Sequence, residues 1–388
     1  MRILRHSRVL TLSAVLGAIT LTGCATAPST APVPAPAGAG TETALDPAVQ
    51  EALDALLEAG ATAAVVDVRD GEQQSAAAGG VRGLDDATAA TAEDRLRIAS
   101  ITKSITATVV LQLVDEGELA LDDEVDTLLP GLLDAPAPVT VRQLLNHRSG
   151  LPEYLDVLVP DANALLGHAD EEYTAQQLLE AAQTKPWVAE PGAQFSYSNG
   201  NYVALGLIAE EVGGAPLPQL IQQRVLDPLG MDDTEYPTDA ELPEGALRGD
   251  VEIGGEQVDV SDTPPSLWSS GAALTSSVGD VSTFFQALLG GELVSDESLA
   301  AMQEIGVEGY GLGLLAGGDA CGVQPPELVF GQRGNGFGYR VMAFGSQDGE
   351  RMTTVAWTGG AFDPAADPLV QPGNDLLIAG LASTCPAA

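Results

Sequence analysis

Ser100 and Lys103 lie three residues apart at the start of a long apolar segment, in the stretch RIASITKSITATVVLQLVDEG of residues 97–117. The apolar spacing predicts a helix over about residues 100–116, with Gly117 just past its end. Residues three apart share a helix face, so both side chains lie at the amino-terminal turn, where free backbone N–H groups meet developing negative charge. A serine beside an amine that can lose its proton is a nucleophile with its general base.

The sequence has only two lysines, Lys103 and Lys185. Arginine supplies every other positive side-chain charge apart from histidine. An arginine stays protonated in proteins, whereas a partly desolvated lysine can become neutral and accept a proton from a hydroxyl. The composition therefore favours Lys103 as a base. A surface lysine that happens to follow a serine is the alternative, since S-x-x-K alone is a weak signal.

Two further stretches carry groups that suit the same reaction. In FSYSN, residues 195–199, Tyr197 can relay a proton if nearby positive charge lowers its pKa, and Asn199 can hold a substrate amide. An ordinary helix cap is the alternative. In GQRGN, residues 331–335, glycines let a strand approach a substrate, and a strand N–H can join that of Ser100 in an oxyanion hole. A plain glycine-rich loop is the alternative.

Other catalytic chemistries lack their residues. After the amino-terminal segment only His147 and His168 remain, and no G-x-S-x-G occurs, so a Ser-His-Asp hydrolase is poorly supported. The sequence has no H-E-x-x-H, no clustered Cys/His set and no nucleotide-binding glycine pattern, so we expect no metal and no cofactor. The formal charge of −39 argues against nucleic acid as a partner.

The first 44 residues predict export and anchoring. Residues 1–23 carry three arginines and then an apolar run too short to span a bilayer, as in a signal peptide. They lead into LTGC, which resembles the bacterial lipoprotein signal in which the cysteine, here Cys24, is lipidated; an ordinary secretory peptide is the alternative. The Ala/Pro-rich residues 24–44 predict a tether ahead of a domain at 45–388. We therefore expect a lipoprotein at the outer face of the cell membrane.

Cys321 and Cys385 remain once Cys24 is assigned to lipid. Export to an oxidising space makes a disulfide between them the simplest outcome. Two buried free thiols are the alternative.

The remaining elements fall into strands at both ends of the chain and helices between them. Such a pattern predicts an α+β fold, with an antiparallel sheet built from the two termini and a helical insertion. The predicted helices are 47–58, 174–183, 199–212, 218–226 and 278–289, and the predicted strands are 63–69, 72–78, 327–330, 339–344 and 352–357.

The three motifs, in this order and with this much chain between them, resemble the serine beta-lactamase-like family, which includes secreted D-Ala-D-Ala carboxypeptidases and class C beta-lactamases. The resemblance covers about residues 45–385, through segments such as VRQLLNHRSGLPEY, LDPLGMDDTEY and SSVGDVSTFFQALLGGELVS. It implies the beta-lactamase/transpeptidase-like fold, with a sheet from about 45–90 and 300–385 and a helical subdomain. It also implies roles for individual residues: Ser100 as nucleophile, Lys103 as base, Tyr197 as proton shuttle, Asn199 as substrate-orienting residue, Trp268 as cleft wall, and the N–H groups of Ser100 and Asn335 as the oxyanion hole.

The third motif departs from the family pattern. Family members carry Lys or His, then Thr or Ser, then Gly, whereas this chain has Gln332, Arg333 and Gly334. Glutamine cannot supply the positive charge that lowers the tyrosine pKa and attracts a substrate carboxylate. An arginine that carboxypeptidase relatives place after GYGLGL is also missing. Arg333 or Arg340 could compensate, although Arg333 follows Gln332 on a strand and should face the opposite side.

We expect a serine hydrolase that forms an acyl-enzyme on Ser100, with D-alanyl-D-alanine carboxypeptidase activity on peptidoglycan-type peptides as the favoured function. A beta-lactamase or esterase on the same scaffold and a catalytically impaired cell-wall binding protein are the alternatives. We assign His147 to packing, because a histidine is often simply a satisfied polar residue. We also expect a monomer.

Overall fold

The structure, a computed structural model, describes residues 41–42, 44–168, 171–322 and 327–386. Cys24 and the predicted signal peptide lie outside these residues, as does most of the predicted tether, so the lipid anchor remains a prediction. The short strand β1, Thr41–Glu42, lies within the residues predicted as tether. No helix in the described part of the chain is long and apolar enough to cross a bilayer.

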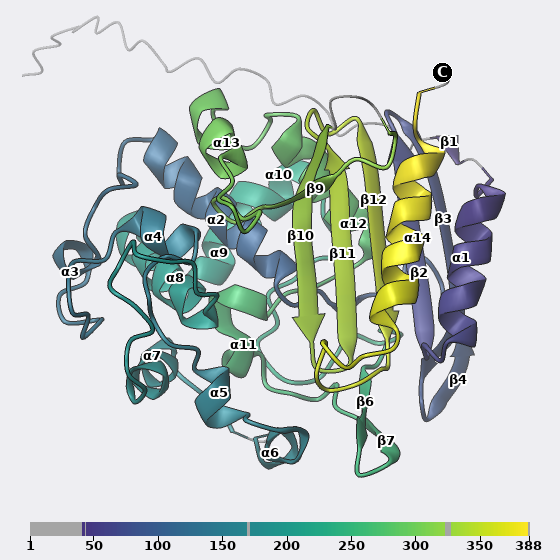
Figure 1. Cartoon of the computed structure of the whole chain (residues 1–388), viewed down its shortest axis with the longest axis horizontal. Helices are drawn as coiled ribbons and strands as arrows, with labels where there is room; N and C mark the ends of the chain where they lie inside the picture. Colours follow the sequence, from purple (N-terminus) through teal and green to yellow (C-terminus); the bar gives the residue numbers. More distant parts are fainter. Residues whose placement is uncertain (1–40, 43, 169–170, 323–326, 387–388) are drawn as a thin grey trace, which may run out of the picture. The chain divides into compact units, whose positions relative to one another are not determined.

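One large sheet, assembled from both ends of the described chain, organises the domain (Figure 1). The strand order is β1-β3-β2-β12-β11-β10-β9, with β4 paired to β3. All pairs are antiparallel except the short contact of β1 with β3. The other strands are β2 (Ala63–Asp70), β3 (Gln73–Gly83), β4 (Asp86–Ala89), β9 (Leu315–Gly318), β10 (Leu328–Gly336), β11 (Tyr339–Ser346) and β12 (Arg351–Thr358).

Helices cover both faces of this sheet, which explains why its central strands are apolar on both sides. Along β2, Val66 belongs to the core under α1 (Pro47–Glu58) and α14 (Val370–Ser383), whereas Val65 belongs to the larger core that contains α2 (Ile101–Asp115). Figure 1 shows α1 and α14 side by side across one face and α12 (Val278–Leu289) behind it. The site lies on the α2 side.

Helix α2 is buried on nearly all sides, as expected of a helix that is apolar all round. Its hydroxyl groups find acceptors in neighbouring segments: Ser104 donates to the carbonyl of Gly313 at 2.7 Å, and Thr106 donates to that of Ser270 at 2.8 Å. These bonds fix α2 between the segment that precedes β9 and the helical region.

The helical region lies between the two halves of the sheet in the sequence, as predicted. It also carries the small pairs β5 (Leu96–Arg97) with β8 (Thr275–Ser276) and β6 (Asp250–Ile253) with β7 (Glu256–Asp259). Its helices, with α13 near the second half of the sheet, are α3 (Val125–Leu128), α4 (Val141–Leu145), α5 (Leu155–Leu158), α6 (Ala162–Gly167), α7 (Ala175–Gln183), α8 (Asn199–Gly213), α9 (Leu217–Ile221), α10 (Asp227–Leu229), α11 (Pro265–Ala272) and α13 (Asp296–Gln303).

Two predicted strands end too early, and one predicted helix changes type. The strand predicted over 72–78 is β3, which continues to Gly83, and the helix predicted over 218–226 is α9 followed by a π-helical turn, Gln222–Leu226. The strand predicted over 327–330 continues to Gly336, so the glycine-rich third motif lies inside β10 and not in a loop. The reason is the unbroken ladder from Val329↔Ser346 to Gly336↔Tyr339 with β11, which holds the glycines extended despite their weak strand preference.

Candidate active site

Ser100 and Lys103 meet at the amino-terminal end of α2, as the sequence predicts. Ser100 is the N-cap residue and is 8% exposed, and Lys103 is fully buried. The Lys103 Nζ atom lies 3.0 Å from Ser100 Oγ, 2.6 Å from Asn199 Oδ1 and 2.9 Å from the carbonyl oxygen of Gly271. The sequence prediction that these side chains share one face is confirmed.

These three contacts determine where the lone pair of a neutral Lys103 points. A neutral amine has two N–H bonds and one lone pair. Asn199 Oδ1 and the Gly271 carbonyl can only accept, so they take the two N–H bonds and leave the lone pair for the hydroxyl of Ser100. Burial lowers the pKa of Lys103 to about 7, although the carboxylate of Glu153 acts in the opposite direction. Lys103 can therefore serve as the general base near neutral pH.

Tyr197 completes the hydrogen bonding of Ser100, because its hydroxyl donates to Ser100 Oγ at 2.8 Å. Desolvation and the nearby Tyr310 raise the pKa of Tyr197, and only the bond to Ser100 acts to lower it. The condition set for Tyr197 as a relay, a pKa lowered by nearby positive charge, is not met, because the shift is upward. Tyr197 is a proton donor in this arrangement, which leaves Lys103 as the base.

Asn199 is hydrogen-bonded to Glu153, a residue that lies outside the three sequence motifs. The carboxylate oxygen Oε2 of Glu153 accepts from the backbone N–H of Asn199 at 2.7 Å and from its Nδ2 at 3.0 Å. One signal could have found Glu153: it is the only acidic residue between Asp134 and Asp156. A carboxylate that is taken partly out of water needs a donor partner.

His147 packs against the aromatic rings of the site. Its ring lies 4.2 Å from that of Tyr197 and 4.9 Å from that of Tyr310, and its Nδ1 accepts from the backbone N–H of Ser198 at 3.3 Å. Burial and the charge of Lys103 lower its pKa well below the usual value. The geometry agrees with a packing role, because these contacts hold the ring of Tyr197 and none reaches Ser100.

The three non-glycine residues with positive φ in the described part of the chain all adjoin this site: Ala99 (47°), His147 (56°) and Ser269 (46°). Ala99 directly precedes the nucleophile. Ser269 interrupts α11, and two residues later the carbonyl of Gly271 accepts from Lys103. Strained backbone conformations of this kind persist where the surrounding structure fixes them, often at functional sites.

The third motif lies against the turn that precedes Ser100. A Cβ atom on Gly334 would come 2.3 Å from the carbonyl oxygen of Ile98, so only glycine allows this approach. Strand β9 pairs with β10 only as far as Gly331, which leaves the β10 edge beyond it without a strand partner among the described residues. This edge carries the N–H of Asn335, whose oxyanion role remains a prediction.

Gln332 takes up the position of the cation that family members carry there. It is 2% exposed, and its Nε2 donates to the hydroxyl of Tyr310 and to the carbonyl of Gly313, both at 3.2 Å. Its Oε1 accepts from the N–H of Arg333 at 3.0 Å. The position is therefore neutral and its hydrogen bonds are satisfied within the protein.

Neither arginine near the motif replaces that cation. A contact of Arg333 with substrate remains a prediction. Its guanidinium lies 5.6 Å from the ring of Phe344, on the side of the sheet expected for a residue that follows Gln332. The reason is the alternation of side chains along a strand. Arg340 is buried and pairs with Asp367 at 3.1 Å.

Trp268 lies beside Ala99 and lines a narrow apolar pocket there with Phe337 and Tyr339. Its ring is 4.9 Å from that of Phe337, which in turn stacks on Phe362 at 4.8 Å. These rings form an aromatic wall next to the nucleophile, where the resemblance predicts the cleft.

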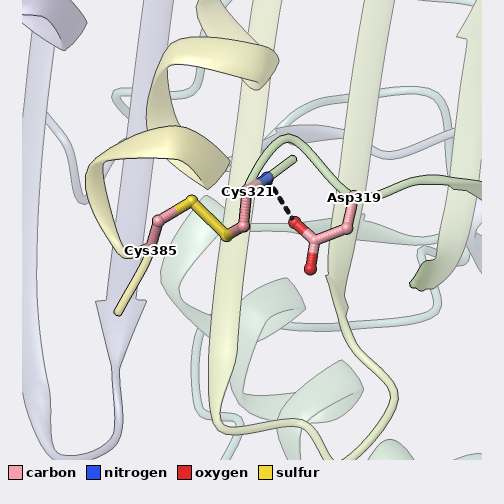
Figure 2. A group of neighbouring side chains, drawn as sticks. All are labelled: Asp319, Cys321 and Cys385. Atoms are coloured by element: carbon pink, nitrogen blue, oxygen red, sulfur yellow. Dashed lines mark hydrogen bonds between the residues drawn. A yellow bond between two sulfur atoms is a disulfide. The ribbon is translucent and has the colours of Figure 1, made fainter. Parts of the chain in front are cut away.

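Cys321 and Cys385 form a disulfide, as predicted, and lie beside Asp319 (Figure 2). The bond ties the segment after β9 to the carboxyl end of α14. In the described ranges these three residues are the only group of metal-ligand types close enough to share an ion. Because both sulfurs are in the disulfide, neither is the thiolate that a metal would need.

A family model described as Beta-lactamase matches residues 49–382. The D-aminopeptidase of Brucella anthropi is 30% identical over 331 residues, 78% of this chain and 57% of that protein. Esterase EstB of Burkholderia gladioli is 37% identical over 154 residues, 37% of this chain and 39% of that protein. The crystal structure of a D-stereospecific amidohydrolase from Streptomyces sp. has 31% identity and a TM-score of 0.74, over 84% of this chain and 97% of that one.

This chain thus spans little more than half, or less, of the length of these curated relatives. The family match nevertheless covers most of this chain, and the antiparallel sheet with flanking helices is the fold of its structural relatives. The chain belongs to the Beta-lactamase family.

Proposed function

We propose that this protein hydrolyses small amides or esters through an acyl-enzyme on Ser100, and that the leaving group does not need a carboxylate. The observation that carries the second part is Gln332, a neutral residue bonded to Tyr310 where relatives have a cation. A charge-assisted pair with a substrate carboxylate needs such a cation. The three contacts of Lys103 support the first part.

In the acylation step, neutral Lys103 takes the proton of Ser100 while Oγ attacks the substrate carbonyl. The carbonyl electron pair moves onto oxygen, where the N–H groups of Ser100 and Asn335 stabilise it. When the carbonyl re-forms, the bond to the leaving group breaks and the leaving group takes the proton of the Tyr197 hydroxyl, which Lys103 replaces. A water molecule then attacks the acyl-enzyme by the same proton path in reverse, and Ser100 is released.

The relatives support a substrate whose acyl group is a D-amino acid, since they include a D-aminopeptidase and a D-stereospecific amidohydrolase. Another relative is an esterase, which supports ester as well as amide substrates. D-alanyl-D-alanine carboxypeptidase activity on peptidoglycan-type peptides is the second candidate. The predicted export and the motif resemblance favour it, whereas the neutral Gln332 weighs against it.

Mass spectrometry of the intact protein tests the mechanism. After incubation with a fluorophosphonate or a beta-lactam, we expect a single adduct on the wild type and none on Ser100→Ala. Rates on D-alanine amide, a short-chain p-nitrophenyl ester and a D-Ala-D-Ala peptide then rank the substrates. An unmodified wild type would instead favour a wall-associated binding protein that does not turn over.

We propose in addition that Cys24 is lipidated and holds the domain at the outer face of the membrane as a monomer. The support is the sequence LTGC after an apolar run. Membrane fractions of the native host should contain the wild type and lose Cys24→Ser to the medium. Equal retention of both proteins would argue against a lipid anchor.

A further inference from the structure

Glu153 occupies a position from which it can fix the catalytic amine without touching it. It lies between the turn of His147 and the short helix α5, where its Oε1 accepts from the backbone N–H of Leu155 at 3.0 Å. Its Oε2 accepts twice from Asn199, at 2.7 Å from the backbone N–H and 3.0 Å from Nδ2. Glu153 is thus anchored on one side and aimed at Asn199 on the other.

This bonding decides which end of the Asn199 amide faces Lys103. A carboxylate can only accept, so the Nδ2 of Asn199 must point to Glu153 and its Oδ1 to the amine, 2.6 Å away. The opposite orientation would set Nδ2 against the lysine N–H bonds. A hydrogen-bonded relay therefore runs from Glu153 through Asn199 and Lys103 to Ser100.

Resting on the acyl-enzyme function proposed above, we propose that Glu153 is a positioning residue for acylation: through Asn199 it aims the lone pair of Lys103 at Ser100, and its negative charge balances the proton that Lys103 takes up. The proton moves from Ser100 to Lys103, so Lys103 gains a positive charge close to the part-buried carboxylate of Glu153. Burial without such a partner would make that charge costly.

The electrostatics agree with this geometry. The charge of Glu153 raises the pKa of Lys103 against the larger lowering by desolvation, and burial raises the pKa of Glu153 itself. The other groups facing Lys103 are the rings of Tyr197 and Tyr202, 5.0 and 5.5 Å from its Nζ, and neutral His147. Glu153 is also near Asp156, Tyr154 and Tyr197, and the charge of Asp156 raises its pKa.

The small number of lysines allows a direct test that does not depend on activity. With ¹³C-labelled lysine only Lys103 and Lys185 give signals, and Lys185→Arg identifies which is which. The ¹³Cε shift of Lys103 is titrated from about pH 5 to pH 10 in the wild type and in Glu153→Gln. We expect the pKa of Lys103 to fall by about one unit in the variant, since a balancing charge is lost. The signal of Lys185, which pairs with Asp156 at the surface, should be the same in the wild type and in Glu153→Gln at each pH.

Three further variants separate a positioning role from a purely structural one. Glu153→Asp keeps the charge, so its Lys103 pKa should stay closer to the wild type than that of Glu153→Gln. Glu58→Gln removes an exposed carboxylate from α1 and should change nothing. Glu153→Ala loses both acceptors and should acylate about 100-fold more slowly, because a small displacement of a catalytic group has an effect of that size.

The pH dependence of acylation by a fluorophosphonate connects the titration to the reaction. In Glu153→Gln the acid limb of the rate should shift to lower pH together with the pKa of Lys103. An unchanged Lys103 pKa, or a shifted pKa with an unchanged acid limb, overturns the proposal. If the wild type forms no adduct, the acyl-enzyme function fails, whereas the lysine titration still decides whether Glu153 controls Lys103.

Discussion

The amide of Gln332 donates to the hydroxyl of Tyr310 at 3.2 Å, so a neutral pair closes the end of the site where the family pattern has a cation. The same amide donates to the Gly313 carbonyl. With these acceptors inside the protein, Gln332 has no need of a substrate carboxylate. The consequence is a site with catalytic groups in place but without the charge that selects a free acid.

The first prediction concerns Gln332. Wild-type protein should cleave a D-Ala-D-Ala peptide and its carboxyl-terminal amide with similar kcat/KM. In Gln332→His, measured below the imidazole pKa, the ratio should favour the free carboxylate by about tenfold, because a charge-assisted bond becomes available. Arg333→Ala is the control and should leave the ratio unchanged, since the guanidinium of Arg333 lies against the ring of Phe344, on the opposite side of the strand from Gln332. A strong wild-type preference for the free acid that Arg333→Ala abolishes would contradict this.

The second prediction is the pH dependence of acylation. The pKa of Lys103 is lowered to about 7, and only the neutral amine can take the proton of Ser100. The acylation rate should therefore rise with pH through about 7 and then level off. Tyr197 adds no fall in the neutral range, because its pKa is raised and it stays protonated. A rate that decreases between pH 6 and 8, measured with a fluorophosphonate, would mean that the protonated amine is the active form.

The third prediction concerns His147, which is buried and neutral. In His147→Gln, kcat should remain within about tenfold of the wild type, since general acid–base groups typically contribute 100-fold or more. The melting temperature should fall, because the stack on Tyr197 and the acceptor for the N–H of Ser198 are disturbed. A loss of activity as complete as that of Ser100→Ala would assign His147 to catalysis.

The nucleophile, the base and most element boundaries could be predicted from the sequence, because they depend on local spacing. A three-residue separation on a helix sets Ser100 beside Lys103, and strand alternation alone anticipates that Gln332 and Arg333 face opposite sides. Helix α12, Val278–Leu289, has the predicted bounds because its apolar periodicity ends at a glycine pair.

Contacts between segments that are distant in the sequence could not be predicted from local spacing. Glu153 matters through Asn199, 46 residues away in sequence, and no local pattern links them. The extension of β10 through the glycines depends on its ladder with β11, and the raised pKa of Tyr197 depends on desolvation and on the neighbouring Tyr310. These features arise from tertiary packing, which overrides local preference.

The fourth prediction concerns the disulfide of Cys321 and Cys385, which closes a loop of 64 residues. The double variant Cys321→Ser, Cys385→Ser should lose about 4 kcal/mol of unfolding free energy in the chain-entropy model. Its acylation rate should stay near that of the wild type, because neither cysteine borders the site. Urea unfolding with and without reductant measures the effect, and a wild type that reductant does not destabilise would contradict it.

The last prediction concerns Gly334, where β10 passes the turn that precedes the nucleophile. In Gly334→Ala the new methyl carbon would meet the carbonyl oxygen of Ile98 at 2.3 Å, so the strand must move away from Ala99 and Ser100. That movement separates the N–H of Asn335 from the N–H of Ser100, and the acylation rate should drop by about 100-fold. Gly318→Ala is the matched control, because a methyl group on that glycine of β9 has no atom within 4 Å and should leave the rate unchanged. Thermal melts of both variants show whether the fold is kept, and a folded Gly334→Ala that acylates at the wild-type rate would mean that β10 does not supply the oxyanion hole.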